Sequence, residues 1–219
     1  MNCCTPEQQA KDDFFTSRSR RYSKRLRKKG LDAAQKFLFE GISETINTRD
    51  NSPAESVMEI GCGVGGLLLA VLQKGLKKAV GVDASSGMID FARENAAAKK
   101  LESQTRFFHG DFSAVENEIE CMDIVILDKV LCCDANPDLL IKNSARKAAK
   151  VYAVSYPRDN FLIRYLVKAG IAVAKILPMK FTPFYHEPSD LRRFINEQHF
   201  SLAFSRNTII WQVEVYRKN

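Results

Sequence analysis

The chain has 219 residues, of which 45% are hydrophobic and 27% are charged, with a formal net charge of +7. This balance suits one soluble α/β domain with a sizeable core. No apolar run approaches the ~18–20 residues that span a bilayer, and the start lacks the basic and then apolar layout of a secretory signal, so we expect a cytoplasmic protein.

The six cysteines form no CxxC pair and no metal-type spacing with the three histidines. We therefore expect reduced thiols and no metal site.

The positive charge is concentrated in residues 18–29, which hold eight Lys or Arg and no acid. From totals of 33 basic and 26 acidic residues, 25 basic and 26 acidic residues remain elsewhere. Such a block can bind nucleic acid, anionic lipid or an acidic substrate. We favour the alternative, in which it is the solvated face of a helix whose apolar side carries Phe15, Tyr22 and Leu26.

Two helices are predicted first, over residues 8–29 and 31–46, separated by Gly30. A polar linker over residues 47–55 follows, so we expect residues 1–50 to form a helical cap and residues 51–219 the main domain.

From residue 56 onward, strand and helix patterns alternate, which predicts a parallel sheet with helices on both faces. The expected strands are 56–60, 79–83, 105–109, 123–128 and 150–156, and the expected helices are 65–74, 86–99 and 137–147.

The last third of the chain departs from this alternation of strands and helices. A helical pattern over residues 159–177 precedes an aromatic stretch, 178–188, that begins and ends with proline. A short helix over residues 189–198 follows, with Ser189 as its expected N-cap. The final strands, 200–205 and 208–217, are so closely joined that they must form an antiparallel hairpin.

The strongest local signal is VMEIGCGVGG at residues 57–66, a hydrophobic strand that runs into closely spaced glycines and then a helix. Gly61, Gly63 and Gly66 also satisfy a dinucleotide-binding fingerprint, with Asp83 where that fold expects its ribose acid. Glu59 argues against this alternative, because an acid there repels a pyrophosphate but suits the cationic amino acid end of a sulfonium cofactor.

A second signal is HGDF at residues 109–112, where a carboxylate can accept a hydrogen bond from an adenine amino group and Phe112 can flank the ring.

Four motifs in this order resemble the class I S-adenosylmethionine-dependent methyltransferases: ExGxGxG at residues 59–65, Asp83, GDF at 110–112 and DIVILD at 123–128. The resemblance implies a Rossmann-like, doubly wound, seven-stranded sheet, mostly parallel, with an antiparallel C-terminal hairpin. It makes residues 51–219 the methyltransferase domain and S-adenosyl-L-methionine the cofactor.

The resemblance also implies where the cofactor binds. The methionine part would contact the glycine turn and the end of the fourth strand, the ribose would bind Asp83, and the adenine would lie near the next residues and the GDF motif. Together with Glu59, the implied cofactor-binding residues are Gly61, Cys62, Gly63, Gly65, Asp83, Ala84, Ser85, Met88, Asp111, Phe112, Asp128 and Lys129.

The acceptor site should lie above the carboxyl ends of the strands, under the N-terminal helices and a lid-like insertion, 157–188. The aromatic residues of that insertion can form a lid or simply core: Phe161, Tyr165, Phe181, Phe184 and Tyr185.

A base is needed only for acceptors that must lose a proton. His186 is the preferred catalytic candidate, because a neutral imidazole suits chemistry near pH 7, and Tyr156 is the second. Tyr185 and Asp128 are further candidates, and a purely structural role for His186 stays open.

Several acceptor classes do not fit. Adenine-N6 enzymes carry an Asp/Asn-Pro-Pro-aromatic run after the fourth strand, whereas this chain has DKVL at residues 128–131. The Pro-Cys nucleophile of cytosine-C5 enzymes does not occur. The double-glutamate loop of arginine methyltransferases is also missing.

The segment order is most similar to small-molecule O- and C-methyltransferases, and among these to the magnesium-protoporphyrin O-methyltransferases. LCC at residues 131–133 stands where those have an Ile-His-Tyr type sequence, so the porphyrin substrate is not carried over. We expect a small-molecule acceptor. An RNA-directed enzyme using the basic helix and a non-catalytic cofactor-binding subunit are the alternatives.

Overall fold

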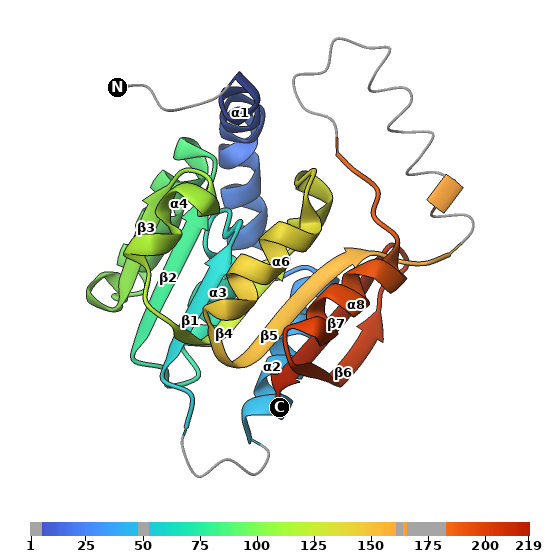
Figure 1. The fold of residues 1–219 in the computed structure, drawn as a ribbon. Coiled ribbons are helices and arrows are strands. Elements are labelled where there is room, and N and C mark those ends of the chain that lie inside the picture. The colour runs from blue at the N-terminus through green and yellow to red at the C-terminus, as the bar shows by residue number, and fades with distance from the viewer. Residues whose placement is uncertain (1–5, 48–52, 161–163, 166–182) are drawn as a thin grey trace.

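The computed structural model describes residues 6–47, 53–160, 164–165 and 183–219. Within this part, the chain folds around a seven-stranded sheet with the order β3-β2-β1-β4-β5-β7-β6 (Figure 1). The strands are β1 (Ser56–Ile60), β2 (Lys78–Asp83), β3 (Thr105–His109), β4 (Met122–Asp128), β5 (Ala148–Pro157), β6 (Phe200–Asn207) and β7 (Trp211–Lys218).

The first five strands pair in parallel, whereas β7 runs antiparallel to both β5 and β6. The predicted Rossmann-like sheet with an antiparallel C-terminal hairpin is therefore confirmed.

Side chains of the central strands alternate between two buried layers, as the period of two requires. In β1, for example, Val57 packs on one side of the sheet and Met58 on the other. Helices α2 (Ala33–Asn47) and α3 (Gly66–Leu72) contribute to the layer that contains Val57. Helices α6 (Pro137–Arg146) and α8 (Pro188–Glu197) cover the layer that contains Met58.

Two further helices lie toward the β3 side of the molecule (Figure 1). Helix α4 (Ser86–Ala98) packs against β2 and β3, and helix α1 (Pro6–Lys29) packs against α4. Short helical turns complete the described part: η1 (Glu102–Gln104), α5 (Phe112–Val115), η2 (Glu116–Glu118) and η3 (Leu131–Cys133).

One predicted helix start is wrong. The helix expected to be capped by Ser189 begins at Pro188, its N-cap residue is Glu187, and no side chain caps it. Proline favours the first helical position because it has no N–H to leave unpaired and its φ is already helical. Most of the helical pattern predicted over residues 159–177 lies outside the described residues.

No helix in the described part of the chain is both long enough and apolar enough to cross a membrane. The cysteines described there, Cys62, Cys121, Cys132 and Cys133, carry free thiols.

Candidate active site

The turn after β1 is built from glycines in a conformation that other residues rarely adopt. Gly61, Gly63 and Gly65 have φ angles of +68°, +52° and +77°. A Cβ atom on Gly61 would lie 2.3 Å from Cγ2 of Val130, which follows β4. The turn therefore passes close to the end of β4 only because its first residue is glycine.

Asp83, the last residue of β2, holds this turn in place. Its Oδ2 accepts a hydrogen bond from the Gly63 N–H at 2.7 Å, and its Oδ1 accepts one from the Ser85 N–H at 2.8 Å. Burial raises the pKa of Asp83 to about 6, although both hydrogen bonds act in the opposite direction. The carboxyl group is thus fixed between two loops at the carboxyl ends of β1 and β2.

Glu59 is a buried acid, with only 2% of its surface exposed. Its Oε2 accepts a hydrogen bond from the Leu68 N–H in the first turn of α3, at 2.9 Å. Burial, with a further contribution from the negative charge of Asp128, raises the pKa of Glu59 well above its usual value. A cation next to this carboxyl group would offset the cost of burying its charge.

The end of β4 carries an ion-pair network. Lys129, at a φ of +60°, places its Nζ 2.8 Å from Oδ2 of Asp32 and 3.1 Å from Oδ2 of Asp128. Ser155 donates a hydrogen bond to the other oxygen of Asp128 at 2.6 Å. Burial disfavours the charge of Lys129, yet the two carboxylates raise its pKa above the usual value. Asp32 precedes α2, so this network ties the N-terminal helices to the sheet.

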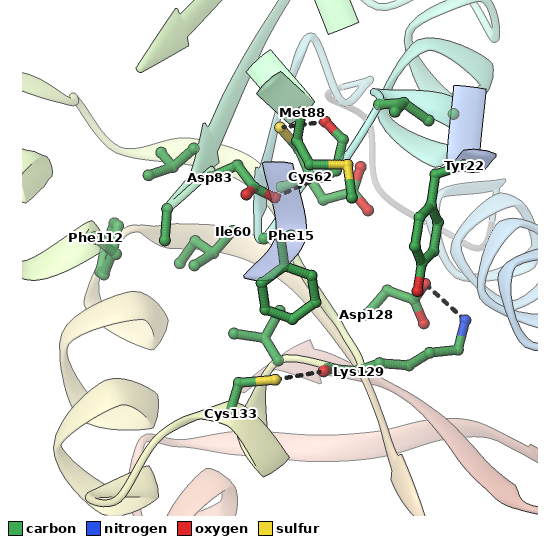
Figure 2. Close-up of a pocket in the computed structure, with 18 of the residues that line it drawn as sticks. Phe15, Tyr22, Ile60, Cys62, Asp83, Met88, Phe112, Asp128, Lys129 and Cys133 are labelled. Carbon is green, nitrogen blue, oxygen red and sulfur yellow. Dashed lines mark hydrogen bonds and ion pairs between the residues drawn. The ribbon is translucent and has the colours of Figure 1, made fainter. Parts of the chain in front are cut away.

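A pocket of about 260 Å³ joins these groups (Figure 2). One part is lined by the glycine turn, Glu59, Asp83 and Phe112. The other part lies under α1, which contributes Phe15 and Tyr22. The pocket therefore runs from the carboxyl ends of the strands to the N-terminal helix.

Helix α1 is held over this pocket by its contact with the first turn of α4. Oδ1 of Asp12 accepts hydrogen bonds from the Ser86 N–H and Oγ, each at 3.0 Å. Oγ1 of Thr16 accepts one from the Gly87 N–H at 3.1 Å. Side chains of one helix thus satisfy the free N–H groups at the start of another.

Residues 51–187 match the family model described as a methyltransferase domain. The chain belongs to this methyltransferase family. The expected class of enzyme, an S-adenosylmethionine-dependent methyltransferase, is thereby confirmed.

A solved structure of magnesium protoporphyrin IX methyltransferase from Synechocystis PCC 6803, with S-adenosylhomocysteine bound, has a similar fold. Its TM-score is 0.67 at 21% identity, and the match covers 95% of this chain and 98% of that one.

Curated relatives match over shorter segments. A release factor glutamine methyltransferase from Caulobacter vibrioides is 37% identical over 73 residues, which is 33% of this chain and 25% of the relative. A 23S rRNA uracil-C5 methyltransferase from a Shewanella strain is 34% identical over 73 residues, 33% of this chain and 16% of the relative. The chain thus spans a quarter or less of the length of these relatives.

Most residues predicted to bind the cofactor line one pocket of this methyltransferase: Glu59, Gly61, Cys62, Gly63, Asp83, Ala84, Met88, Asp111, Phe112, Asp128 and Lys129. Two do not line it. The Gly65 N–H donates to the Cys62 carbonyl within the turn, and the Ser85 hydroxyl caps α4 by accepting from the Met88 N–H at 3.2 Å.

The two predicted catalytic residues lie outside this pocket. Tyr156 is 1% exposed and donates a hydrogen bond to Oε2 of Glu214 at 2.5 Å, and burial together with that carboxylate raises its pKa. His186 is half-buried, with Nε2 2.8 Å from the Asp134 carbonyl oxygen and its ring stacked on Phe184.

The predicted aromatic lid can be followed only in part. Phe161 and Phe181 lie outside the described residues. Tyr165 is 66% exposed, and Phe184 and Tyr185 are half-buried. None of these three described side chains lines the pocket.

Other pocket residues were not predicted from the sequence as site residues: Lys11, Arg25, Asp32, Gln35, Cys133, Asp134 and Leu140. The spacing of Phe15, Tyr22 and Leu26 marked the correct face of α1, and Lys11 and Arg25 share it. Asp32 gave no comparable signal, because its partner Lys129 is 97 residues away.

Proposed function

We propose that this methyltransferase transfers a methyl group from S-adenosylmethionine to a small-molecule acceptor bound between α1 and the end of β4. The observation that carries the proposal is the pocket itself, which continues from the glycine turn to the aromatic side chains of α1.

The donor set of the pocket fits this cofactor. Asp83 offers a carboxylate to ribose hydroxyls, and Phe112, which is 4% exposed, offers an apolar surface to the adenine. The buried Glu59 suits the positively charged amino group at the other end of the molecule. In the described part of the chain, no cluster of three or more metal-binding side chains occurs.

When bound, S-adenosylmethionine supplies an electrophilic methyl group and leaves as S-adenosylhomocysteine. The task of the protein is to align the acceptor and to exclude water. Phe15, Tyr22 and Leu26 of α1 cover the pocket and serve the second purpose. Asp128 is the pocket-lining candidate for a base, since neither Tyr156 nor His186 lines the pocket.

The test is transfer of a tritiated methyl group from S-adenosylmethionine into fractionated small-molecule, RNA and protein pools. We expect label in the small-molecule fraction. Label confined to RNA or to protein would contradict the proposal.

An RNA acceptor is the second candidate, because α1 also carries an exposed basic face. Arg20, Arg21, Lys24 and Lys28 are exposed and do not line the pocket. RNA bound there would lose affinity steeply as the salt concentration rises. Replacing these four residues with Gln would then abolish both RNA binding and methyl transfer, whereas a small-molecule enzyme would keep its activity.

A further inference from the structure

Lys129 has a backbone conformation that is unusual for its residue type. Its φ of +60° lies in the left-handed region, which residues with a Cβ atom rarely adopt. Lys129 and its neighbours Asp128 and Val130 all line the pocket. A residue stays in such a conformation only where the surrounding structure holds it there. The contacts of Lys129 therefore show what fixes the end of β4.

The hydroxyl group of Ser155 connects the two residues of this turn. Ser155 lies opposite Asp128 in the pairing of β4 with β5 and is fully buried. Its Oγ donates a hydrogen bond to Oδ1 of Asp128 at 2.6 Å and accepts one from the Lys129 N–H at 2.9 Å. The same N–H also donates to the Ser155 carbonyl oxygen over a longer distance, 3.3 Å. One buried side chain thus holds both the Asp128 carboxylate and the Lys129 peptide group.

The other contacts of Lys129 constrain its backbone less. Its carbonyl oxygen accepts S–H hydrogen bonds from Cys132 at 3.4 Å and from Cys133 at 3.6 Å, the second of which is drawn in Figure 2. Thiols are weak donors. The ammonium group is paired with Asp32 and Asp128, but it lies at the end of a flexible side chain and does not fix φ. In the described part of the chain, the Ser155 hydroxyl is therefore the strongest constraint on this turn.

The conformation of Lys129 also affects the opposite wall of the pocket. A Cβ atom on Gly61 would lie 2.3 Å from Cγ2 of Val130, so Val130 lies directly against the glycine turn. A change of φ at Lys129 would redirect the chain that follows it and would move Val130 relative to this turn. Ser155 itself does not line the pocket. It can therefore influence the pocket only through Asp128 and Lys129.

We propose that Ser155 is a positioning residue of this methyltransferase. Its hydroxyl group holds Lys129 in the left-handed conformation and so sets the shape of the pocket wall that Asp128, Lys129 and Val130 form. This inference goes beyond the proposed function, because it concerns the shape of the pocket and holds for any acceptor. A serine with a purely structural role would stabilise the fold and leave cofactor binding unchanged.

Ser56 offers a matched control at the opposite end of β4. It is 5% exposed, and its Oγ donates to Oδ2 of Asp123 at 3.0 Å and accepts from the Asp123 N–H at 2.9 Å. Neither residue lines the pocket. Calorimetry with S-adenosylhomocysteine and urea unfolding are applied to the full chain, to Ser155→Ala and to Ser56→Ala. We expect Ser155→Ala to weaken S-adenosylhomocysteine binding about ten-fold and Ser56→Ala less than about two-fold, although both lower the stability.

A second comparison tests whether Ser155 acts through the conformation of Lys129. Lys129→Asn and Lys129→Gln both replace the ammonium group with an amide, but only asparagine adopts the left-handed conformation readily. A residue that favours this conformation depends less on the hydroxyl group. We therefore expect Ser155→Ala to weaken S-adenosylhomocysteine binding about ten-fold when combined with Lys129→Gln, and less than about three-fold when combined with Lys129→Asn.

Unchanged affinity in a folded Ser155→Ala protein would overturn the inference, and so would an equal loss of affinity in Ser56→Ala. An equal effect of Ser155→Ala in the two Lys129 variants would overturn it as well. If Ser155→Ala fails to fold, urea unfolding of the same double variants decides the question. Folding restored by Lys129→Asn but not by Lys129→Gln would support the inference, whereas folding restored by both or by neither would overturn it.

Discussion

Asp83 is the residue at which cofactor binding and stability can be separated most clearly. In Asp83→Asn, the side chain keeps its shape and loses its charge. A pKa raised from 3.8 to about 6 means that the folded state destabilises the charged form by about 3 kcal/mol. The substitution removes this cost.

The same substitution also has a structural cost. Both carboxylate oxygens accept backbone hydrogen bonds, from Gly63 and Ser85, and an amide has only one oxygen. Its NH₂ group must face one of these donors, which costs about 1–3 kcal/mol. Gain and loss nearly cancel, so we expect the free energy of unfolding to change by less than about 2 kcal/mol.

For cofactor binding, no favourable term offsets the loss of the carboxylate charge. Loss of a charged acceptor for the ribose hydroxyls should weaken S-adenosylhomocysteine binding by about 2–3 kcal/mol, roughly 30- to 150-fold in Kd. Calorimetry at pH 7.5 measures the affinity, and thermal unfolding measures the stability. The matched control is Asp90→Asn, an exposed acid of α4 paired with Arg93 at 3.5 Å, which should leave the affinity unchanged.

Two results would refute this reasoning. A folded Asp83→Asn protein with unchanged affinity would mean that the ribose binds elsewhere. A loss of more than about 4 kcal/mol in unfolding free energy would mean that the carboxylate is chiefly structural.

Four further outcomes concern pH, an ion pair and a buried tyrosine. Cofactor affinity should fall about ten-fold between pH 7 and pH 5 as Asp83 takes up a proton, and calorimetry of Asp83→Asn should show no such fall. Because the pKa of Asp83 is raised on folding, the cofactor-free protein should also become less stable as the pH rises from about 4 to 6. Asp32→Asn, which breaks the ion pair with Lys129, should lower the unfolding free energy by about 1–3 kcal/mol in a urea titration. Tyr156→Phe should lower the unfolding free energy by a similar amount, since it removes a hydrogen bond from the buried Glu214, but it should leave methyl transfer intact. Loss of methyl transfer in a folded variant would show that Tyr156 takes part in the reaction.

The sheet and the strand-end part of the pocket could be predicted because short-range patterns determine them. Strands 56–60 and 105–109 have the predicted bounds, and the glycine turn and Asp83 lie where their motifs placed them. Local backbone geometry requires glycine at positive φ and places acids at strand ends, so short sequence motifs are enough to identify both.

The acceptor part could not be predicted in the same way, because its contacts join distant segments. Asp32 reaches Lys129 across 97 residues, and no local pattern signals that pairing. Tyr156 is another example, since the sequence makes it a catalytic candidate. The alternation of β5 places it with Tyr152 and Val154 in a buried layer, where it contacts Glu214 instead of the pocket.

The contact between Asp12 and Ser86 has a consequence for the order of assembly during synthesis. Helix α1 leaves the ribosome before its docking site on α4, because Ser86 lies 74 residues after Asp12. Until then α1 cannot pack against α4, and the loop between the two helices must be closed at an entropic cost. The eight Lys and Arg of residues 18–29 keep such a segment hydrated and self-repelling while it waits. The basic residues of α1 thus oppose premature association of the nascent chain.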